Sequence, residues 1–237
     1  MNIKLIGTGA IYTKYNSACT LIDNKIIVDM PNGTLKQLLK QGLDCKEIKT
    51  IVITHKHGDH TADIPFFLKH ICAYYKENYK ITIIGPLGIR KKIIELFNAY
   101  NFEDEQEFNR FNVDIIETLD NEMEINGYKI NSYQISHGEE KPALGYVINN
   151  KVGLTGDTGI CDGVKRIIQN SKILIADSSL LEGDKCHMGV NNLRDLHTEY
   201  GKEIICTHLR DTTRQYLIEK PIEGIKVVED FAEINIE

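Results

Sequence analysis

Four side chains that commonly bind metal ions stand within six residues of each other in the run Thr54-His55-Lys56-His57-Gly58-Asp59-His60. The run follows the apolar stretch Ile51-Val52-Ile53, which is typical of a buried strand. If that strand stays extended as far as His57, residues two apart project to the same side, so His55 and His57 converge on one ion. Gly58 would let the backbone turn, and Asp59 and His60 would then face a second ion.

The ligand types in this run favour a borderline metal ion. Imidazole groups with one carboxylate suit Zn²⁺ or a similar cation, whereas Mg²⁺ and Ca²⁺ prefer oxygen ligands. The alternative is a surface loop that is merely rich in histidine. Four ligand groups packed closely after a buried strand favour the metal site.

Other acidic and histidine side chains follow predicted strands in the same way. They are His137 after the strand Tyr128–Ser136, Asp157 after Val152–Thr155, Asp177 after Ile173–Ala176 and His208 after Glu203–Cys206. Functional side chains are often carried by loops at the ends of strands, because a rigid sheet positions them. We therefore expect these residues to complete the site that residues 55–60 begin.

Composition limits the class of protein. The chain has 237 residues, of which 42% are hydrophobic, and we expect a single domain over residues 1–237. A net charge of −6 disfavours a broad surface for nucleic acid. The six cysteines show no CxxC spacing and fit reduced thiols, and no signal peptide or membrane span is evident, so we expect a cytoplasmic protein that does not enter a membrane.

Short apolar strands alternate with helical patterns along the chain. Helices are predicted over Thr34–Gln41, Ala62–Ala73, Gly88–Tyr100, Gly163–Gln169, Val190–Tyr200 and Thr212–Leu217. Hairpin turns are predicted at Asp23-Asn24, Asn126-Gly127 and Asn149-Asn150. Strands that meet in hairpins, with helices between them, predict an α+β sandwich of two packed sheets with helices outside.

The HxHxDH pattern of residues 55–60 resembles the signature of the metallo-β-lactamase superfamily, and the resemblance covers essentially the whole chain. Its closest form resembles the ribonuclease Z branch. The segments that carry this closer match are Leu5–Ala10, Asp29–Thr34, Gly85-Pro86, Gly156–Thr158 and Thr207–Arg210, which appear in the family's order.

The resemblance implies a four-layer αββα fold with two divalent metal ions. One ion would be held by His55, His57 and His137, the other by Asp59, His60 and His208, and Asp157 would bridge them. Such a pair of cations lowers the pKa of a shared water, so that hydroxide can attack phosphorus or a carbonyl carbon near neutral pH. Asp59 would also orient that hydroxide. Zn²⁺ fits the ligand types, while Mn²⁺ and Fe²⁺ are the alternatives.

The resemblance also implies a role for His187. In the ribonuclease Z branch a histidine at this place protonates the departing oxygen, and a glutamate partner commonly orients it. Here Asp177 stands at the partner's position, one methylene shorter. The alternative for His187 is a cap on the helix that follows it.

The chain departs from ribonuclease Z in lacking that branch's long transfer RNA-binding arm, since Gly145–Ile148 is followed almost at once by Lys151–Leu154. We therefore expect a phosphodiesterase acting on a small molecule or short nucleotide rather than on a large RNA. Two alternatives stay open: a hydrolase of a lactone, thioester or lactam, and a metal-stabilised binding or sensing module. A homodimer is compatible with the sequence.

Overall fold

The runs of isoleucine and valine form buried strands in the computed structural model, which describes residues 1–75, 79–102 and 111–237. The strands β3 (Ile26–Val28), β4 (Thr50–Val52) and β10 (Val152–Leu154) are buried at every position. Strands covered on both faces need apolar side chains on both, which explains their continuous apolar sequence.

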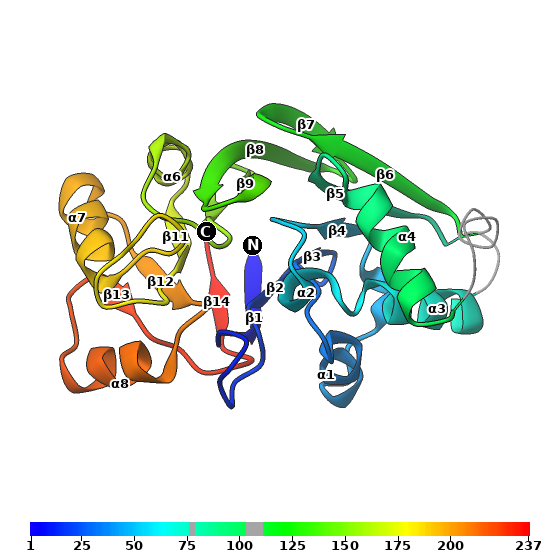
Figure 1. Cartoon of the computed structure of the whole chain (residues 1–237), viewed down its shortest axis with the longest axis horizontal. Coiled ribbons are helices and arrows are strands. Elements are labelled where there is room, and N and C mark those ends of the chain that lie inside the picture. Colours follow the sequence, from blue (N-terminus) through cyan, green and yellow to red (C-terminus); the bar gives the residue numbers. More distant parts are fainter. Residues whose placement is uncertain (76–78, 103–110) are drawn as a thin grey trace.

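The described strands form two mixed sheets (Figure 1). The first has the order β14 (Glu233–Asn235), β1 (Asn2–Gly7), β2 (Cys19–Ile22), β3, β4, β5 (Ile81–Pro86) and β6 (Val113–Thr118). The second has the order β13 (Ile225–Lys226), β12 (Ile204–Thr207), β11 (Ile173–Asp177), β10, β9 (Glu140–Ile148), β8 (Tyr128–His137) and β7 (Asn121–Ile125). In both sheets antiparallel strands continue into parallel ones, from β3 to β6 and from β10 to β13.

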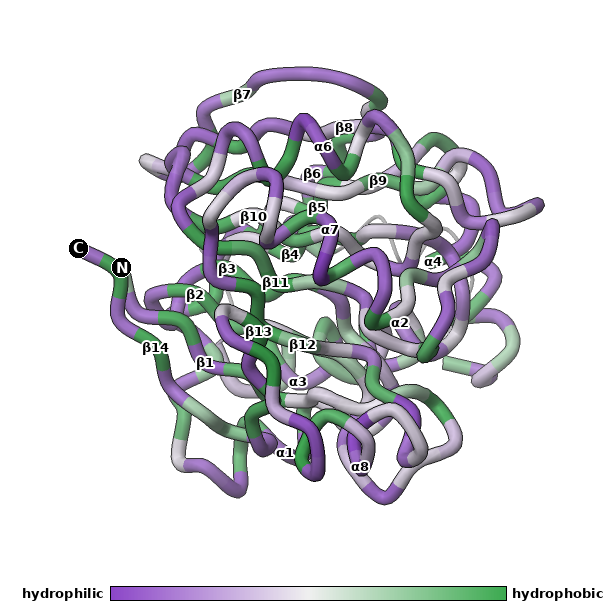
Figure 2. Tube along the Cα trace, turned by 90° about the vertical axis from the view of Figure 1, so that its left-hand side faces the viewer, coloured by the Kyte–Doolittle hydropathy of each residue, from purple (hydrophilic) through white to green (hydrophobic). Residues whose placement is uncertain are grey.

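Helices cover the outer faces of both sheets (Figure 1). Those on the first sheet are α1 (Thr34–Lys40), α3 (Ile64–Tyr75) and α4 (Ile89–Ala99), and those on the second are α6 (Asp162–Gln169), α7 (Val190–Tyr200) and α8 (Asp211–Glu219). The short α2 (Gly58–Thr61) and the 3₁₀ helix η1 (Cys45–Glu47) complete the described helices. A third apolar cluster fills the space between the sheets. In Figure 2, the inner strands are mostly hydrophobic and the segments at the periphery are mostly hydrophilic. The predicted four-layer αββα arrangement is confirmed.

No helix in the described ranges combines the length and apolar composition needed to cross a bilayer. The edge strand β7 was not predicted, because its sequence Asn-Glu-Met-Glu-Ile is mostly polar and its side chains are largely exposed. The helix predicted over Ala62–Ala73 corresponds to α3, which begins at Ile64, whereas the preceding α2 was not predicted. Gly58 is the first residue of α2, without a positive φ, so the turn after His57 does not depend on glycine there.

The three predicted hairpin turns are present, and their Asn and Asp residues adopt positive φ values, as in tight turns between strands. Asn149, Asn150 and Lys151 alone join β9 to β10, with Ile148 paired opposite Val152. The chain therefore has no room for an inserted arm at this connection.

The sheets are joined just below the histidine-rich loop. Tyr146, fully buried on β9, donates a hydrogen bond from its hydroxyl to the carbonyl oxygen of Ile53, 2.8 Å away. The amide of Leu144 donates to the carbonyl oxygen of Thr54, also at 2.8 Å. The second sheet therefore holds the end of β4 at the point where the loop begins.

We expect Tyr146→Phe to lower the free energy of unfolding by about 1–3 kcal/mol, because it leaves the buried carbonyl of Ile53 with one partner fewer. Urea unfolding followed by circular dichroism measures this. Tyr128→Phe is the matched control, since its hydroxyl contacts Asp23 at a partly exposed position and should cost less. Equal losses in the two variants would contradict the prediction.

Candidate metal centre

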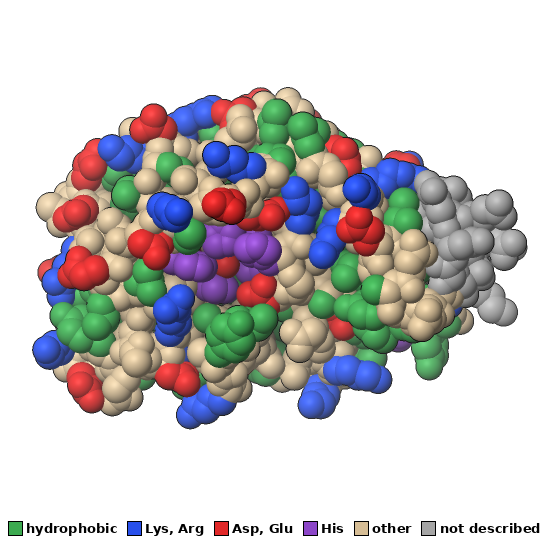
Figure 3. All heavy atoms as spheres, viewed as in Figure 1, with side chains coloured by type: hydrophobic (Ala, Val, Ile, Leu, Met, Phe, Trp, Pro, Cys, Tyr) green, Lys and Arg blue, Asp and Glu red, His purple; other side chains and the backbone are tan. Residues whose placement is uncertain are grey.

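The predicted site residues meet at one edge of the two sheets, because the loops that carry them leave the same ends of neighbouring strands. The histidine-rich loop follows β4, Asp157 follows β10, and His208 follows β12, while β8 ends at His137. Together with His187 they lie around a cleft of about 780 Å³. Figure 3 shows the histidine side chains gathered in a hollow on one face of the molecule.

One group of donor atoms comes from His55, His57 and His137. Nδ1 of His57 lies 3.0 Å from Nε2 of His55 and 3.3 Å from Nε2 of His137. These nitrogens cannot all be protonated at such distances without repulsion, whereas one cation could bind their lone pairs. His55 and His57 converge as predicted.

A second group contains Asp59, His60, Asp157 and His208, whose donor atoms lie within 4.8 Å of one another. Oδ2 of Asp157 lies 3.1 Å from Nε2 of His208 and 3.4 Å from Nε2 of His60. The same oxygen lies 3.9 Å from Nε2 of His55 in the first group. Asp157 therefore stands between the two groups, where a single carboxylate could contact an ion in each.

The donor sets fit divalent cations. Nε2 of His60 is buried and has no hydrogen-bond partner, although an unpaired buried polar atom is costly. Its Nδ1 faces the carboxylate of Asp29 at 2.8 Å, so Nδ1 carries the proton and the lone pair of Nε2 points into the donor group. A metal ion would satisfy that lone pair.

Asp29 organises the histidine-rich loop, a role that the sequence reasoning missed. Its carboxylate accepts hydrogen bonds from the amide and hydroxyl of Thr54, both at 2.8 Å, besides the one from His60. The hydroxyl of Thr54 in turn lies 3.0 Å from Nδ1 of His55. Asp29 thus orients two histidines, one directly and one through Thr54. The signal was its place at the end of β3, in the segment Asp29–Thr34.

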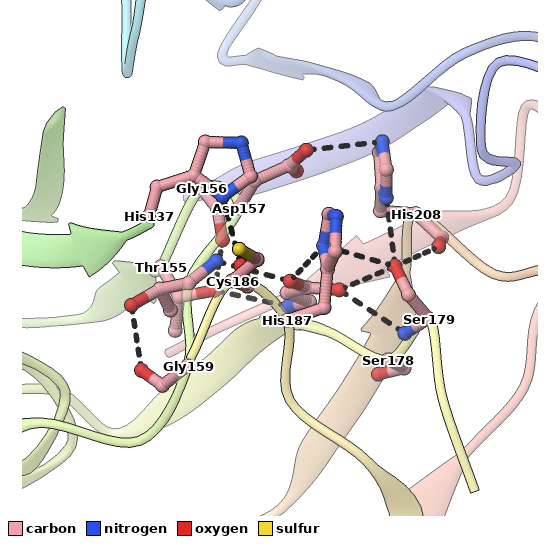
Figure 4. A network of polar contacts seen from close by, with 12 residues as sticks. His137, Thr155, Gly156, Asp157, Gly159, Ser178, Ser179, Cys186, His187 and His208 are labelled. Atoms are coloured by element: carbon pink, nitrogen blue, oxygen red, sulfur yellow. Dashed lines mark hydrogen bonds and ion pairs between the residues drawn. The ribbon is translucent and has the colours of Figure 1, made fainter. Parts of the chain in front are cut away.

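Asp177, the last residue of β11, has the corresponding position in the second sheet. It contacts the polar network in which Figure 4 labels His187, Ser179 and His208. Its Oδ2 lies 2.9 Å from Nδ1 of His187, so the shorter aspartate does reach this histidine. Its Oδ1 accepts a hydrogen bond from the hydroxyl of Ser179, which lies 2.8 Å from Nδ1 of His208. Ser179 was also missed by the sequence reasoning, since one serine beside a strand carries no distinctive signal.

The backbone holds some of these residues in an unusual conformation. Asp29 has a φ of 59° and His208 a φ of 52°, both in the left-handed region that side chains with a Cβ seldom adopt. Such strain persists only where surrounding contacts enforce it, and it is concentrated at functional sites. Nδ1 of His137 donates to the carbonyl oxygen of Cys186, 2.8 Å away, which also fixes that ring.

In the second group, the carboxylate of Asp157 and the neighbouring imidazoles shift each other's pKa values. Burial raises the pKa of the Asp157 carboxyl, but His208 and His60 outweigh it and hold this pKa well below the ordinary value. Burial lowers the pKa of His60, yet Asp157 and Asp29 raise it well above its usual value. The Asp157 carboxylate thus stays ionised and attracts positive charge, which bound cations could supply in place of protons.

Among families of known proteins, the model that matches this chain is that of the anti-Pycsar protein Apyc1, over residues 1–230. The chain belongs to the Apyc1 family. This membership covers the strands and loops that carry every candidate ligand. This member of the Apyc1 family is also similar to ribonuclease Z of Staphylococcus carnosus. The two sequences are 23% identical over 278 aligned positions, and the alignment covers 88% of each protein. The alignment is longer than this chain, so the relative has residues that the chain lacks.

Solved structures agree on the fold of this Apyc1 family member. A diphosphatase from the PhnP family has a TM-score of 0.79 at 17% identity, covering 100% of this chain and 98% of its own. The metallo-β-lactamase fold protein YhfI from Bacillus subtilis has a TM-score of 0.76 at 16% identity, covering 98% of both chains. The predicted metallo-β-lactamase fold is therefore confirmed.

We expect Asp29→Asn to weaken zinc binding about 10- to 100-fold, the range for losing a partner that orients a ligand histidine. The amide keeps the shape of the side chain but no longer carries the charge that holds Nδ1 of His60 protonated. Competition with a chromogenic chelator measures the affinity. Asp44→Asn, at an exposed cap of η1, is the control. Equal affinities in the two variants would exclude this role for Asp29.

Proposed function

We propose that this chain is a dinuclear metal-dependent phosphodiesterase that hydrolyses a small phosphodiester. The observation that carries the proposal is that Asp157, which lies between two donor groups, shares one cleft with His187, whose Nδ1 contacts the buried Asp177. The similarity to ribonuclease Z and to a PhnP-family diphosphatase supports phosphorus rather than carbon as the atom attacked.

In this proposal His55, His57 and His137 hold one ion, and Asp59, His60 and His208 hold the other, with Asp157 contacting both. Bound divalent cations would supply Lewis-acid activation of the attacking water and neutralise charge on the phosphoryl group. Zinc suits these ligands best, and Mn²⁺ and Fe²⁺ are the alternatives. Asp59 lines the cleft with its carboxylate, and its part is to accept a hydrogen bond from the attacking water and orient it.

His187 is the proposed acid. Burial lowers the pKa of its imidazole, but the hydrogen bond and charge of Asp177 outweigh this and raise the pKa above its ordinary value. Because Nδ1 donates to Asp177, Nε2 is the nitrogen that gives its proton to the departing oxygen. Asp184 holds the backbone of this residue, accepting from the amide of His187 at 2.8 Å.

A small substrate suits the surroundings of the cleft. The direct turn from β9 to β10 leaves no inserted arm at that connection to grip a large RNA, and the cleft itself is bordered by the acidic side chains of Glu139 and Asp211. Repulsion by these carboxylates disfavours a long polyanion. A short phosphodiester can place its single charge at the cations instead.

The first experiment compares chromogenic substrates with the zinc- or manganese-loaded chain. We expect bis(p-nitrophenyl) phosphate to be hydrolysed, chelation to abolish this activity, and restored activity to saturate at two ions per chain. Asp157→Ala should lose at least one ion and most of the turnover. If a lactone or lactam were hydrolysed while the phosphodiester stayed inert, the proposal would be wrong. No hydrolysis of any class would favour a binding or sensing module.

We expect His187→Ala to affect poor leaving groups much more than good ones. An alkoxide needs a proton as it departs, so its release should slow about 10²- to 10⁴-fold, whereas p-nitrophenolate leaves unaided and should slow far less. Rates across phosphodiesters of graded leaving-group pKa measure this. His70→Ala, on α3, is the control. Uniform losses for all leaving groups would indicate that His187 is a metal ligand, which its position near His137 and Asp157 also allows.

A further inference from the structure

A small cavity lies between the two sheets, directly behind the candidate metal centre. Its volume is about 30 Å³, and all but one of the residues that line it are buried. We call it the inner chamber. Strand ends of both sheets line it, with Thr20 and Val28 from the first sheet and Ile175 and Thr207 from the second. Asp157 lines both this chamber and the cleft, so it stands between the two spaces.

The alternation of β12 turns a polar side chain towards the inner chamber. Ile205 belongs to the apolar cluster between the sheets, and Cys206 belongs to the cluster beneath the helices of the second sheet. Because successive side chains of a strand point to opposite faces, Thr207 faces between the sheets, as Ile205 does. Valine would have the same shape as Thr207 at this place in the core, but it would bring no hydroxyl.

The hydroxyl of Thr207 has no partner in the protein. Thr207 is only 9% exposed, and no atom in residues 1–75, 79–102 and 111–237 forms a hydrogen bond with its Oγ1. An unpaired buried hydroxyl is costly, and nearly all buried polar groups are paired with protein atoms or with ordered water. The inner chamber is the space in which such a partner can lie.

Asp157 also has an unused acceptor. Its contacts with His55, His60 and His208 are all made by Oδ2. Within the described ranges of the chain, its Oδ1 makes no hydrogen bond or ion pair. Asp157 therefore turns one oxygen to the two donor groups and has a second oxygen left to accept a hydrogen bond.

The size and lining of the inner chamber suit water. A buried water needs a cavity of roughly 10–15 Å³ and two to four polar partners, whereas cavities that stay empty are apolar. The chamber, at about 30 Å³, has room for one or two waters. The hydroxyls of Thr20 and Thr207 and the carboxylate of Asp157 supply the donors and acceptors that such a water requires.

We propose that the inner chamber holds an ordered water that accepts a hydrogen bond from Thr207 and donates one to Oδ1 of Asp157. Thr207 is then a positioning residue, because through this water it fixes the plane of the carboxylate whose Oδ2 faces both donor groups. Its effect on metal ions rests on the proposed function, in which Asp157 contacts both ions. The presence of the water does not depend on that function.

A crystal structure of the unmodified, zinc-loaded chain tests the water directly. We expect electron density for a water within hydrogen-bonding distance of Oγ1 of Thr207 and Oδ1 of Asp157. Thr207→Ser should keep this water and Thr207→Val should lose it. An empty chamber in the unmodified chain would overturn the proposal.

Unfolding in urea at saturating zinc gives a second test through the sign of the change. If the water is bound, Thr207→Val loses its hydrogen bonds and the urea midpoint falls. If the chamber is dry, the same substitution removes an unpaired hydroxyl and the midpoint rises. A higher midpoint in Thr207→Val would therefore exclude the water.

The positioning role is tested by zinc affinity. Competition with a chromogenic chelator should show zinc bound about 10- to 100-fold more weakly by Thr207→Val, the range for losing a group that orients a ligand. Thr207→Ser should bind zinc as tightly as the unmodified chain. Thr82→Val is the matched control, since it changes a buried threonine of β5 that does not line the chamber.

An unchanged zinc affinity in a Thr207→Val variant that has lost the water would overturn the positioning role. A loss of the same size in Thr82→Val would overturn it as well, because the effect would then be that of any buried threonine. None of these measurements requires turnover. Their outcomes are therefore independent of whether bis(p-nitrophenyl) phosphate is a substrate.

Discussion

The buried carboxylate of Asp29 is the interaction on which the candidate site depends. It stands at the end of β3 and takes hydrogen bonds from the amide and hydroxyl of Thr54 and from His60. Residues 54–60 would otherwise have to satisfy these donors elsewhere, because buried polar groups need partners. One carboxylate therefore fixes both the path of the loop and the ring orientation of two of its histidines.

The second sheet also places a buried carboxylate behind two histidines, on the opposite side of the candidate metal centre from Asp29. Asp177, at the end of β11, contacts His187 directly and His208 through the hydroxyl of Ser179. Each sheet thus supplies a buried acid that orients two histidines, and Asp157 lies where the two halves meet. Because the sheets are packed together through Tyr146 and the apolar cluster between them, the two halves keep a constant separation.

The parts that would select a substrate lie outside this framework. The loop between β1 and β2 forms part of the cleft wall without altering the strands that carry the donor groups. When the loops that line a cleft are separate from the strands that carry the donor groups, those loops can change to fit different substrates while the donor groups stay the same. Such a separation is consistent with the similarity of this chain to two proteins named for different reactions, ribonuclease Z and a PhnP-family diphosphatase.

The class of fold and the candidate ligands could both be predicted from the sequence, because local patterns encode them. Buried parallel strands require unbroken apolar runs, and the histidines and aspartates follow those runs directly. Edge strands such as β7 escaped prediction, since they are only partly buried and their composition is polar. The side chains that orient the candidate ligands could be identified only once the strands were placed in space. Asp29 and Ser179 act across strands that are distant in sequence, 31 and 29 residues from His60 and His208, and no local pattern encodes such a contact.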